Sequence, residues 1–375
     1  MTTGATVCAV AALAIFAAVS FIHLRHAGLT IFTTISPLPG LAIVHFGPAF
    51  LGVPAPAIKL EVLVAAFCLF GAEILAASFV ARVVEGYTKT SAIRATLATA
   101  AVVLLVAMVT TAIFVLAWLP VNGLREAVAI ELLLAGGSVL LLMPLGALAI
   151  FLNEDFIARA NRAREWRERL LENVSAAAFP RWGFTIFGVG LVFAALGFFG
   201  AHLDAAHNVT RANWLSIAIA FAAVAVASGI VTRDWRRALA LFMSIAFVAL
   251  LGLWIFGGIP SHGTAQIALS LALGASLLSM LRMAVQHRRY AVLPEAANGA
   301  GAHAIVTIGS MVIFAAFAVT GFLGVWVVAG FVALRVVLVV LAGCTASLLL
   351  YPAICAVLET LLPRRATLAA RYRLP

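Results

Sequence analysis

The chain has 375 residues, of which 65% are apolar and only 10% are charged, and its mean hydropathy is +1.15. A soluble domain is roughly half apolar and about a quarter charged, so this composition excludes a water-soluble enzyme or nucleic-acid-binding protein. Four cysteines lie in apolar runs without a CxxC pair, namely Cys8, Cys68, Cys344 and Cys355. We interpret them as small apolar side chains rather than as disulfide partners or metal ligands.

The apolar runs predict an all-α polytopic membrane protein. A spanning helix needs about 20 apolar residues, and backbone groups in lipid must bond to one another within the helix. We expect about eleven such helices, at roughly 5–22, 28–51, 60–81, 93–118, 127–152, 183–200, 212–231, 238–257, 265–285, 303–323 and 325–350. The runs are too long for the strands of a membrane β-barrel. The first run lacks a basic start, so we interpret it as a membrane helix and not as a cleaved signal peptide.

The basic residues predict the orientation of these helices. Alternate loops place about twenty Lys and Arg residues on one side and three on the other, which are Lys59, Arg125 and Arg211. Because cytoplasmic loops carry the excess of basic residues, the N-terminus is expected outside and the C-terminus in the cytoplasm. The net charge of +10 then follows from topology, and no nucleic acid is needed to explain it.

The one long polar stretch, residues 153–182, is rich in arginine and carries scattered large apolar residues. Such a segment is either an amphipathic helix at the cytoplasmic membrane surface or a solvated linker helix. We expect it to join two membrane repeats, the first with five helices over 1–152 and the second with six over 183–375. The expected localisation is the bacterial inner membrane.

Three short patterns recur with nearly constant spacing, which indicates an internal repeat. A basic turn and a span precede Gly-Val-Pro at 52–54 and Gly-Ile-Pro at 258–260. Phe-Gly-Ala-Glu at 70–73 corresponds to Leu-Gly-Ala-Ser at 273–276, and Leu-Leu-Met-Pro at 141–144 to Leu-Leu-Tyr-Pro at 349–352. The offsets are about 206 residues, and both copies have the same orientation, as in transporters built from parallel repeats.

At these residues the chain resembles the resistance–nodulation–division (RND) superfamily, in the branch of MMPL and hopanoid-associated transporters. The resemblance implies two parallel bundles similar to sterol-sensing modules. The chain is expected to differ from typical members of the family in lacking the first family helix and both large extracytoplasmic domains. Only about eleven residues, 201–211, separate the two spans between which the second domain is expected.

Glu73 is the strongest candidate for a functional residue. It lies midway along 60–81, where the resemblance implies a proton-carrying acid of the fourth family helix. A carboxylate at mid-membrane costs about 3 kcal/mol or more, so its presence there suggests a function. We expect Glu73 to be a proton relay or, alternatively, a hydrogen-bonded structural acid. The corresponding residue of the second repeat, Ser276, cannot ionise, so at most one repeat carries a proton.

Other polar residues in the predicted spans are secondary candidates. Arg335 must be paired or reach the interface, and Glu73 or Glu131 are its candidate partners. Glu131 is expected mainly at the interface, because it lies about one turn into its span. His45 is either a hydrogen-bonded core residue or a second relay. The sequence contains no recognisable hydrolase, phosphate-binding or metal motif, so we expect no enzyme activity, catalytic residue or cofactor.

These features lead to alternative functions. The first is an inner-membrane RND/MMPL-type transporter, acting in efflux or lipid transport, that moves a hydrophobic substrate by proton flux through Glu73. The second is a transport-inactive module that binds membrane lipids, or a periplasmic or membrane partner subunit, as a sensor or assembly factor. The third is a fragment of a split transporter.

Overall fold

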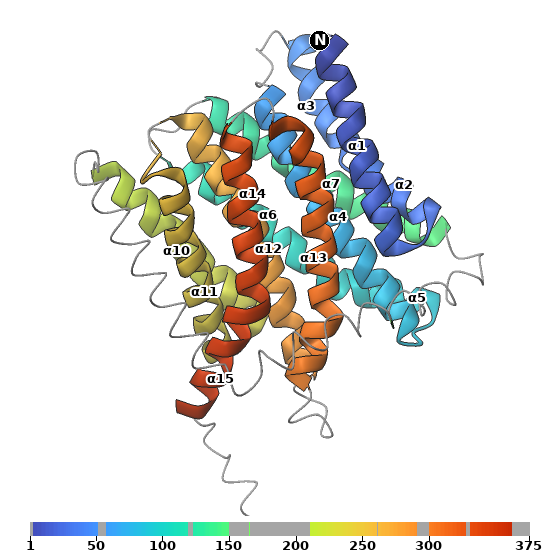
Figure 1. The fold of residues 1–375 in the computed structure, drawn as a ribbon, viewed down its shortest axis with the longest axis vertical. Helices are drawn as coiled ribbons and strands as arrows, with labels where there is room; N and C mark the ends of the chain where they lie inside the picture. The colour runs from blue at the N-terminus through green and yellow to red at the C-terminus, as the bar shows by residue number, and fades with distance from the viewer. Residues whose placement is uncertain are drawn as a thin grey trace, which may run out of the picture.

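The computed structural model describes residues 3–51, 58–118, 123–149, 165, 211–260, 262–290, 300–327 and 331–361. Every regular element in these ranges is a helix, and nine segments among them are long and apolar enough to cross a membrane (Figure 1). The prediction of an all-α polytopic membrane protein is therefore confirmed. The predicted span at 183–200 and the linker at 153–182 lie outside the described residues.

The first five predicted spans form α1 (Thr3–Leu24), α2 (Ala27–Ile35), α3 (Leu38–Leu51), α4 (Ile58–Val84), α5 (Lys89–Thr96), the π-helical turn η1 (Leu97–Ala101), α6 (Val102–Ala117) and α7 (Gly123–Ala149). The described later spans form α10 (Arg211–Thr232), α11 (Trp235–Phe256), α12 (Gly263–Tyr290), α13 (Ala300–Val327), α14 (Phe331–Thr345), the π-helical turn η3 (Ala346–Leu350) and α15 (Tyr351–Leu361). These bounds lie within a few residues of most predicted ends.

The predicted span 28–51 is bent. Its prolines, Pro37, Pro39 and Pro48, predict kinks, and the chain turns between α2 and α3 at Ser36 and Pro37. A proline inside a helix removes a backbone donor and clashes with the preceding turn, so a break at this position is expected physically. Both pieces still lie within one apolar stretch.

Helices α4 and α12 form the centre of the bundle, where they contact each other. Their membrane-spanning windows are 89% and 94% buried, against 28% for α1 and for α10. The other helices surround them: α13 and α7 pack on α4, and α6 and α14 pack on α12. This arrangement shields any polar side chain on α4 from lipid.

Helices related by the repeat offset pack in related ways. Helix α1 packs on α13 and α10 packs on α6, so each repeat contributes a peripheral helix to the other. The two basic turns also share a conformation. Arg25 and Arg233 both adopt positive φ, at 56° and 51°, and the helix that follows each is capped by His26 or Asp234 in extended conformation. The division into repeats at 1–152 and 183–375 stays a prediction, which these pairings support.

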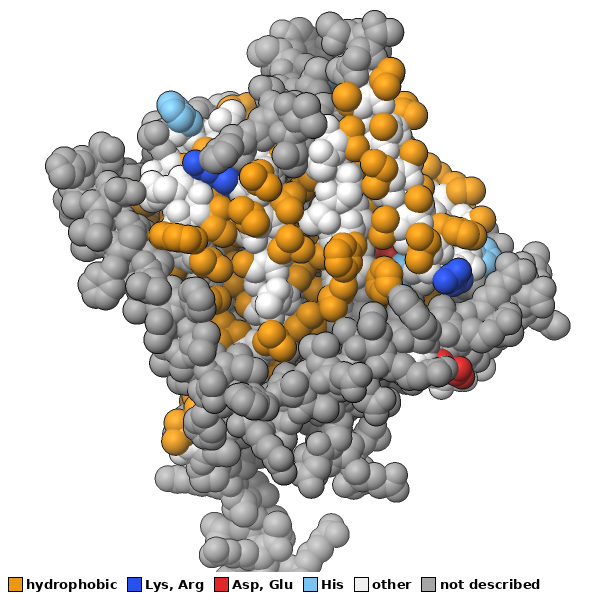
Figure 2. Space-filling view, in the orientation of Figure 1, with side chains coloured by type: hydrophobic (Ala, Val, Ile, Leu, Met, Phe, Trp, Pro, Cys, Tyr) orange, Lys and Arg blue, Asp and Glu red, His pale blue; other side chains and the backbone are white. Residues whose placement is uncertain are grey.

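The outer surface of the bundle is apolar. Figure 2 shows hydrophobic side chains covering the described helices on the visible face. Large apolar residues on the outward faces of α1, α7 and α10 are exposed, among them Val10 at 62%, Leu141 at 71% and Val226 at 62%. Such a surface is unfavourable in water and suits contact with lipid chains.

Candidate functional site

The buried acid Glu73 lies in a hydrogen-bonded cluster formed by α1 and α4. Its side chain is fully buried, as are those of Ser20 and, at 3% exposure, His23. The Ser20 hydroxyl donates to Oε2 of Glu73 at 2.5 Å, and Nδ1 of His23 lies 2.5 Å from Oε1. We call these three residues the Ser20–Glu73–His23 cluster. Both oxygens of the carboxyl group are thus satisfied by side chains, as burial of a polar group requires.

The local sequence of α1 places Ser20 and His23 on one face. Residues three or four apart share a side of a helix, and Ala12, Phe16, Ser20 and His23 are all buried at this spacing. This stripe lies against α13 and α4. The imidazole of His23 stacks on Phe314 of α13, with ring centroids 4.8 Å apart and an interplanar angle of 7°. The stacking holds the ring in the plane from which Nδ1 reaches Glu73.

The cluster has the chemistry of a proton-binding site. A proton between Glu73 and His23 can reside on the carboxyl group, leaving both groups neutral, or on the imidazole, leaving an ion pair. Movement between these states needs no water, because the two atoms are already at hydrogen-bond distance. Glu73 lies near the middle of α4, while His23 is one residue from the end of α1 and two from exposed Arg25. The pair therefore connects the bundle interior with the α1–α2 turn.

Sequence reasoning identified Glu73 but missed its two partners. His23 appeared only as part of a basic turn, and Ser20 was not considered. A usable signal was present, because a serine and a histidine three residues apart interrupt an otherwise apolar helix. Their spacing alone does not say which of the other helices they face.

Arg335 does not pair with Glu73, contrary to one of the two expectations for this residue. Its guanidinium donates to the backbone carbonyl of Phe256 at 3.0 Å and lies over the Phe256 ring. Phe256 is the last residue of α11, where carbonyl groups lack partners within the helix. The long side chain thus reaches the end of a neighbouring helix, which is the snorkelling alternative.

The remaining candidates take separate positions. Ser276 is buried between α12 and α14, where its hydroxyl bonds to the carbonyls of Ala272 and Val339. His45 on α3 bonds through Nδ1 to Glu61 on α4 at 2.9 Å. Glu131 is fully buried in α7, since α2, α3, α4 and α6 pack around this helix, and its position at the membrane interface stays a prediction. None of these residues contacts the Ser20–Glu73–His23 cluster through a hydrogen bond in the described part of the chain.

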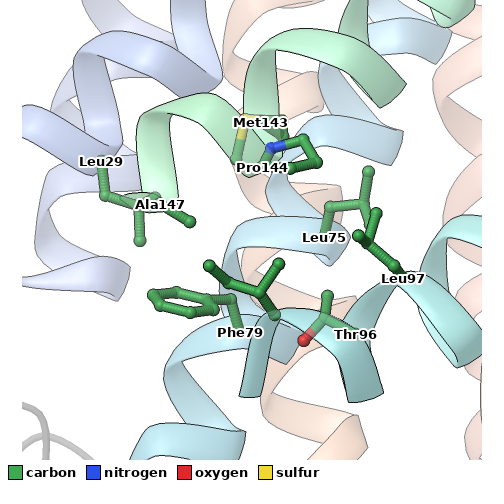
Figure 3. A pocket seen from close by; sticks show the side chains of 9 residues that line it. Leu29, Leu75, Phe79, Thr96, Leu97, Met143, Pro144 and Ala147 are labelled. Carbon is green, nitrogen blue, oxygen red and sulfur yellow. The ribbon is translucent and has the colours of Figure 1, made fainter. Parts of the chain in front are cut away.

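A small pocket of about 20 Å³ lies among α2, α4, α5, η1 and α7 (Figure 3). Its lining is apolar apart from Thr96; the lining residues are Leu29, Leu75, Phe79, Ile93, Thr96, Leu97, Met143, Pro144 and Ala147. This volume is enough for about one water molecule or for the end of a larger group. Leu97 is 38% exposed, so the pocket reaches the outer face of the bundle.

Thr96 gives this pocket one polar group without a partner. Most described threonines in the helices donate to a carbonyl one turn earlier, as Thr99 does to Ala95. The hydroxyl of Thr96 is buried and has no hydrogen-bond partner among the described residues. A molecule whose polar end reached this pocket could satisfy the hydroxyl.

No protein-family model and no curated protein sequence matches this chain. The fold is similar to that in the crystal structure of SecDF, a translocon-associated membrane protein, from Thermus thermophilus, with a TM-score of 0.64 and 13% identity. A second structure, SecDF in the super-membrane-facing form, matches with a TM-score of 0.63 and 12% identity. The matches cover 95% and 97% of this chain, but only 62% of each SecDF chain. At this identity the likeness concerns fold alone: nearly the whole chain shares the helical arrangement of a membrane protein of the SecDF type.

Proposed function

We propose that this protein is a proton-coupled transporter of the RND type that moves a hydrophobic, lipid-type substrate. The observation that carries the proposal is the Ser20–Glu73–His23 cluster, a short-bonded acid and imidazole buried where α1, α4 and α13 meet. The fold supports the same class, because SecDF is an RND-superfamily transporter. The sequence resemblance to this superfamily rests on different observations, namely the repeat and its motifs.

In the proposed cycle, the cluster binds a proton from one side of the membrane and releases it to the other. Proton binding changes the net charge of a site inside the bundle, and a buried charge is costly unless its surroundings rearrange. Helix α1 supplies two of the three groups but is itself mostly exposed. A shift of α1 against α4 and α13 is therefore the movement that protonation would favour.

The lipid-type substrate is inferred from the pocket and from the MMPL and hopanoid resemblance. The pocket opens on the apolar side of the bundle, where membrane lipids are the available molecules. Its lone hydroxyl on Thr96 favours a molecule with one hydroxyl or carbonyl group. We further propose the bacterial inner membrane as the location, with the N-terminus outside.

Proton flux into proteoliposomes, followed with an internal pH-sensitive dye, tests the proton-coupled function. We expect a flux in the wild-type protein that is lost in Glu73→Gln, which keeps the shape and removes the titratable group. Glu126→Gln is the matched control, because Glu126 is exposed in the first turn of α7. Unchanged flux in Glu73→Gln would remove the relay role.

A second candidate function is a transport-inactive module that binds lipid or a partner subunit. The short sequence between 201 and 211 favours it, because no large extracytoplasmic domain fits there. The translocon association named for SecDF supports a membrane partner as one form of this module. A wild-type protein that conducts no protons, yet binds a fluorescent lipid in a manner weakened by Thr96→Val, would favour the module over the transporter.

A further inference from the structure

Glu131 of α7 is the second fully buried acid in the described part of the molecule, and its environment differs from that of Glu73. Neither of its carboxyl oxygens has a hydrogen-bond partner among the described residues. A charged carboxylate without a partner is strongly disfavoured inside a membrane protein, because neither water nor a counter-ion compensates its charge. Binding a proton removes that charge, so the geometry alone favours a protonated side chain.

The charged groups around Glu131 point to the same state. Helices α2, α3, α4 and α6 pack against α7, and α2 and α6 contain no titratable residue. The described titratable groups of α3 and α4 are His45, Glu61, Cys68, Glu73, and Arg82 near the far end of α4; on α7 itself they are Arg125 and Glu126. Arg125 donates to the carbonyl of Trp118 and to the side chain of Gln266. The acid Glu61 on α4 further disfavours a negative charge on Glu131.

Glu131 lies at the same end of the bundle as the partly exposed pair of His45 and Glu61. Glu131 lies eight residues into α7, which is about 12 Å at 1.5 Å per residue. Glu61 lies three residues into α4, and His45 six residues before the end of α3. Because α3 ends and α4 and α7 begin on the same side of the bundle, the three residues occupy one end of it. The side chains of His45 and Glu61 are 31% and 16% exposed and bonded to each other.

Glu131 lies deeper in the bundle than Glu61, because it is eight residues from the start of α7 and Glu61 is three residues from the start of α4. Cys68 lies two turns beyond Glu61 on the same face of α4. Glu73 follows Cys68 by five residues, which is about 140° around the helix, and it bonds to α1. The Ser20–Glu73–His23 cluster therefore lies on a different face of α4 from Glu61 and Cys68, and Glu131 has no hydrogen bond to it.

We propose that Glu131 is a second proton-binding site, which holds its proton within the membrane and exchanges it, through the Glu61–His45 pair, with the side where α7 begins. An imidazole–carboxylate pair that is partly exposed can take a proton from water and pass it inward. The proposal does not depend on transport through Glu73.

Dicyclohexylcarbodiimide tests the proposal, because this apolar reagent modifies protonated carboxyl groups in membrane interiors. We expect the full-length wild-type protein in native membrane vesicles to carry the modification on Glu131 after peptide mass mapping. Labelling at this position is expected to be lost in Glu131→Gln and to persist in Glu73→Gln and Glu126→Gln. Because labelling of Glu131 persists in Glu73→Gln, this test can succeed or fail independently of the proton-flux test of the proposed transporter.

The side of proton exchange is tested with oriented vesicles. Exposed Glu126, near the start of α7, identifies the side by its reaction with a membrane-impermeant carbodiimide. Labelling of Glu131 should fall when the pH is raised on that side and not on the other, and this response should be lost in the double variant Glu61→Gln and His45→Ala. A response to the opposite side overturns the exchange route. Absence of both the label and a Glu131-dependent carboxylic acid band in the infrared spectrum overturns the site itself.

Discussion

The hydrogen bond between Ser20 and Glu73 makes a quantitative prediction about stability. Both side chains are fully buried and the bond is 2.5 Å long. Side-chain hydrogen bonds between membrane helices contribute about 0.6 kcal/mol on average and up to about 1.7 kcal/mol. For a bond to a carboxyl group with both partners buried we expect the upper end of this range, about 1.5 kcal/mol. This corresponds to roughly a tenfold change in the unfolding equilibrium.

A double-mutant cycle measures this energy. Ser20→Ala removes the donor, and Glu73→Met removes the acceptor while keeping a similar volume. Reversible unfolding in mixed detergent and dodecyl sulfate micelles, followed by circular dichroism, gives the free energy of unfolding of the wild type, both single variants and the double variant. The matched control replaces Glu73→Met by Glu131→Met, since Glu131 does not bond to Ser20, and its coupling should be within about 0.5 kcal/mol of zero. A coupling for Ser20 and Glu73 as small as that of the control would refute the reasoning.

Three further predictions follow from single contacts. Gly274→Ala should lower the free energy of unfolding by about 1–3 kcal/mol, because its new Cβ would overlap α6. Gly229→Ala is the control and should leave the free energy of unfolding unchanged, because no atom lies within 4 Å of its new Cβ. Thermal unfolding of the two variants tests this difference. Arg335→Gln should cost about 1 kcal/mol through its lost bond to the end of α11, yet leave proton flux within about twofold of wild type; loss of flux would mean that Arg335 acts on the relay. Thr96→Val should weaken binding of a hydroxyl-bearing photoactivatable lipid by about fivefold, equal to about 1 kcal/mol. Thr99→Val should leave this binding unchanged, because the Thr99 hydroxyl is already bonded within the protein. Equal crosslinking yields in the two variants would contradict the pocket assignment.

The helices and the central acid could be predicted from the sequence because each depends on local information. Apolar runs near the required length identify the spans, and a lone acid in the middle of one of them identifies Glu73. The break between α2 and α3 could also be predicted, because Pro37 and Pro39 interrupt the apolar run. These features need no knowledge of how helices pack.

The partners of the polar residues could not be predicted, since they depend on which helix faces join. Ser20 and His23 reach Glu73 only because α1 packs between α4 and α13. Arg335 was a candidate partner for Glu73 by charge alone, but its neighbour is the end of α11. In the same way, Glu131 is buried because α2, α3, α4 and α6 surround α7, and no pattern within α7 shows this.

The burial of α4 and α12 has a consequence for biogenesis. Each of these helices carries polar side chains that are covered only by other helices, including Glu73 on α4 and Arg282 and Gln286 on α12. During synthesis such a segment meets lipid before its neighbours exist, and partition of its charged residues into lipid is unfavourable. We expect α4 and α12 to remain beside the insertion machinery until the helices that flank them emerge, so that the most protected helices of the finished protein are the last to be released into the bilayer.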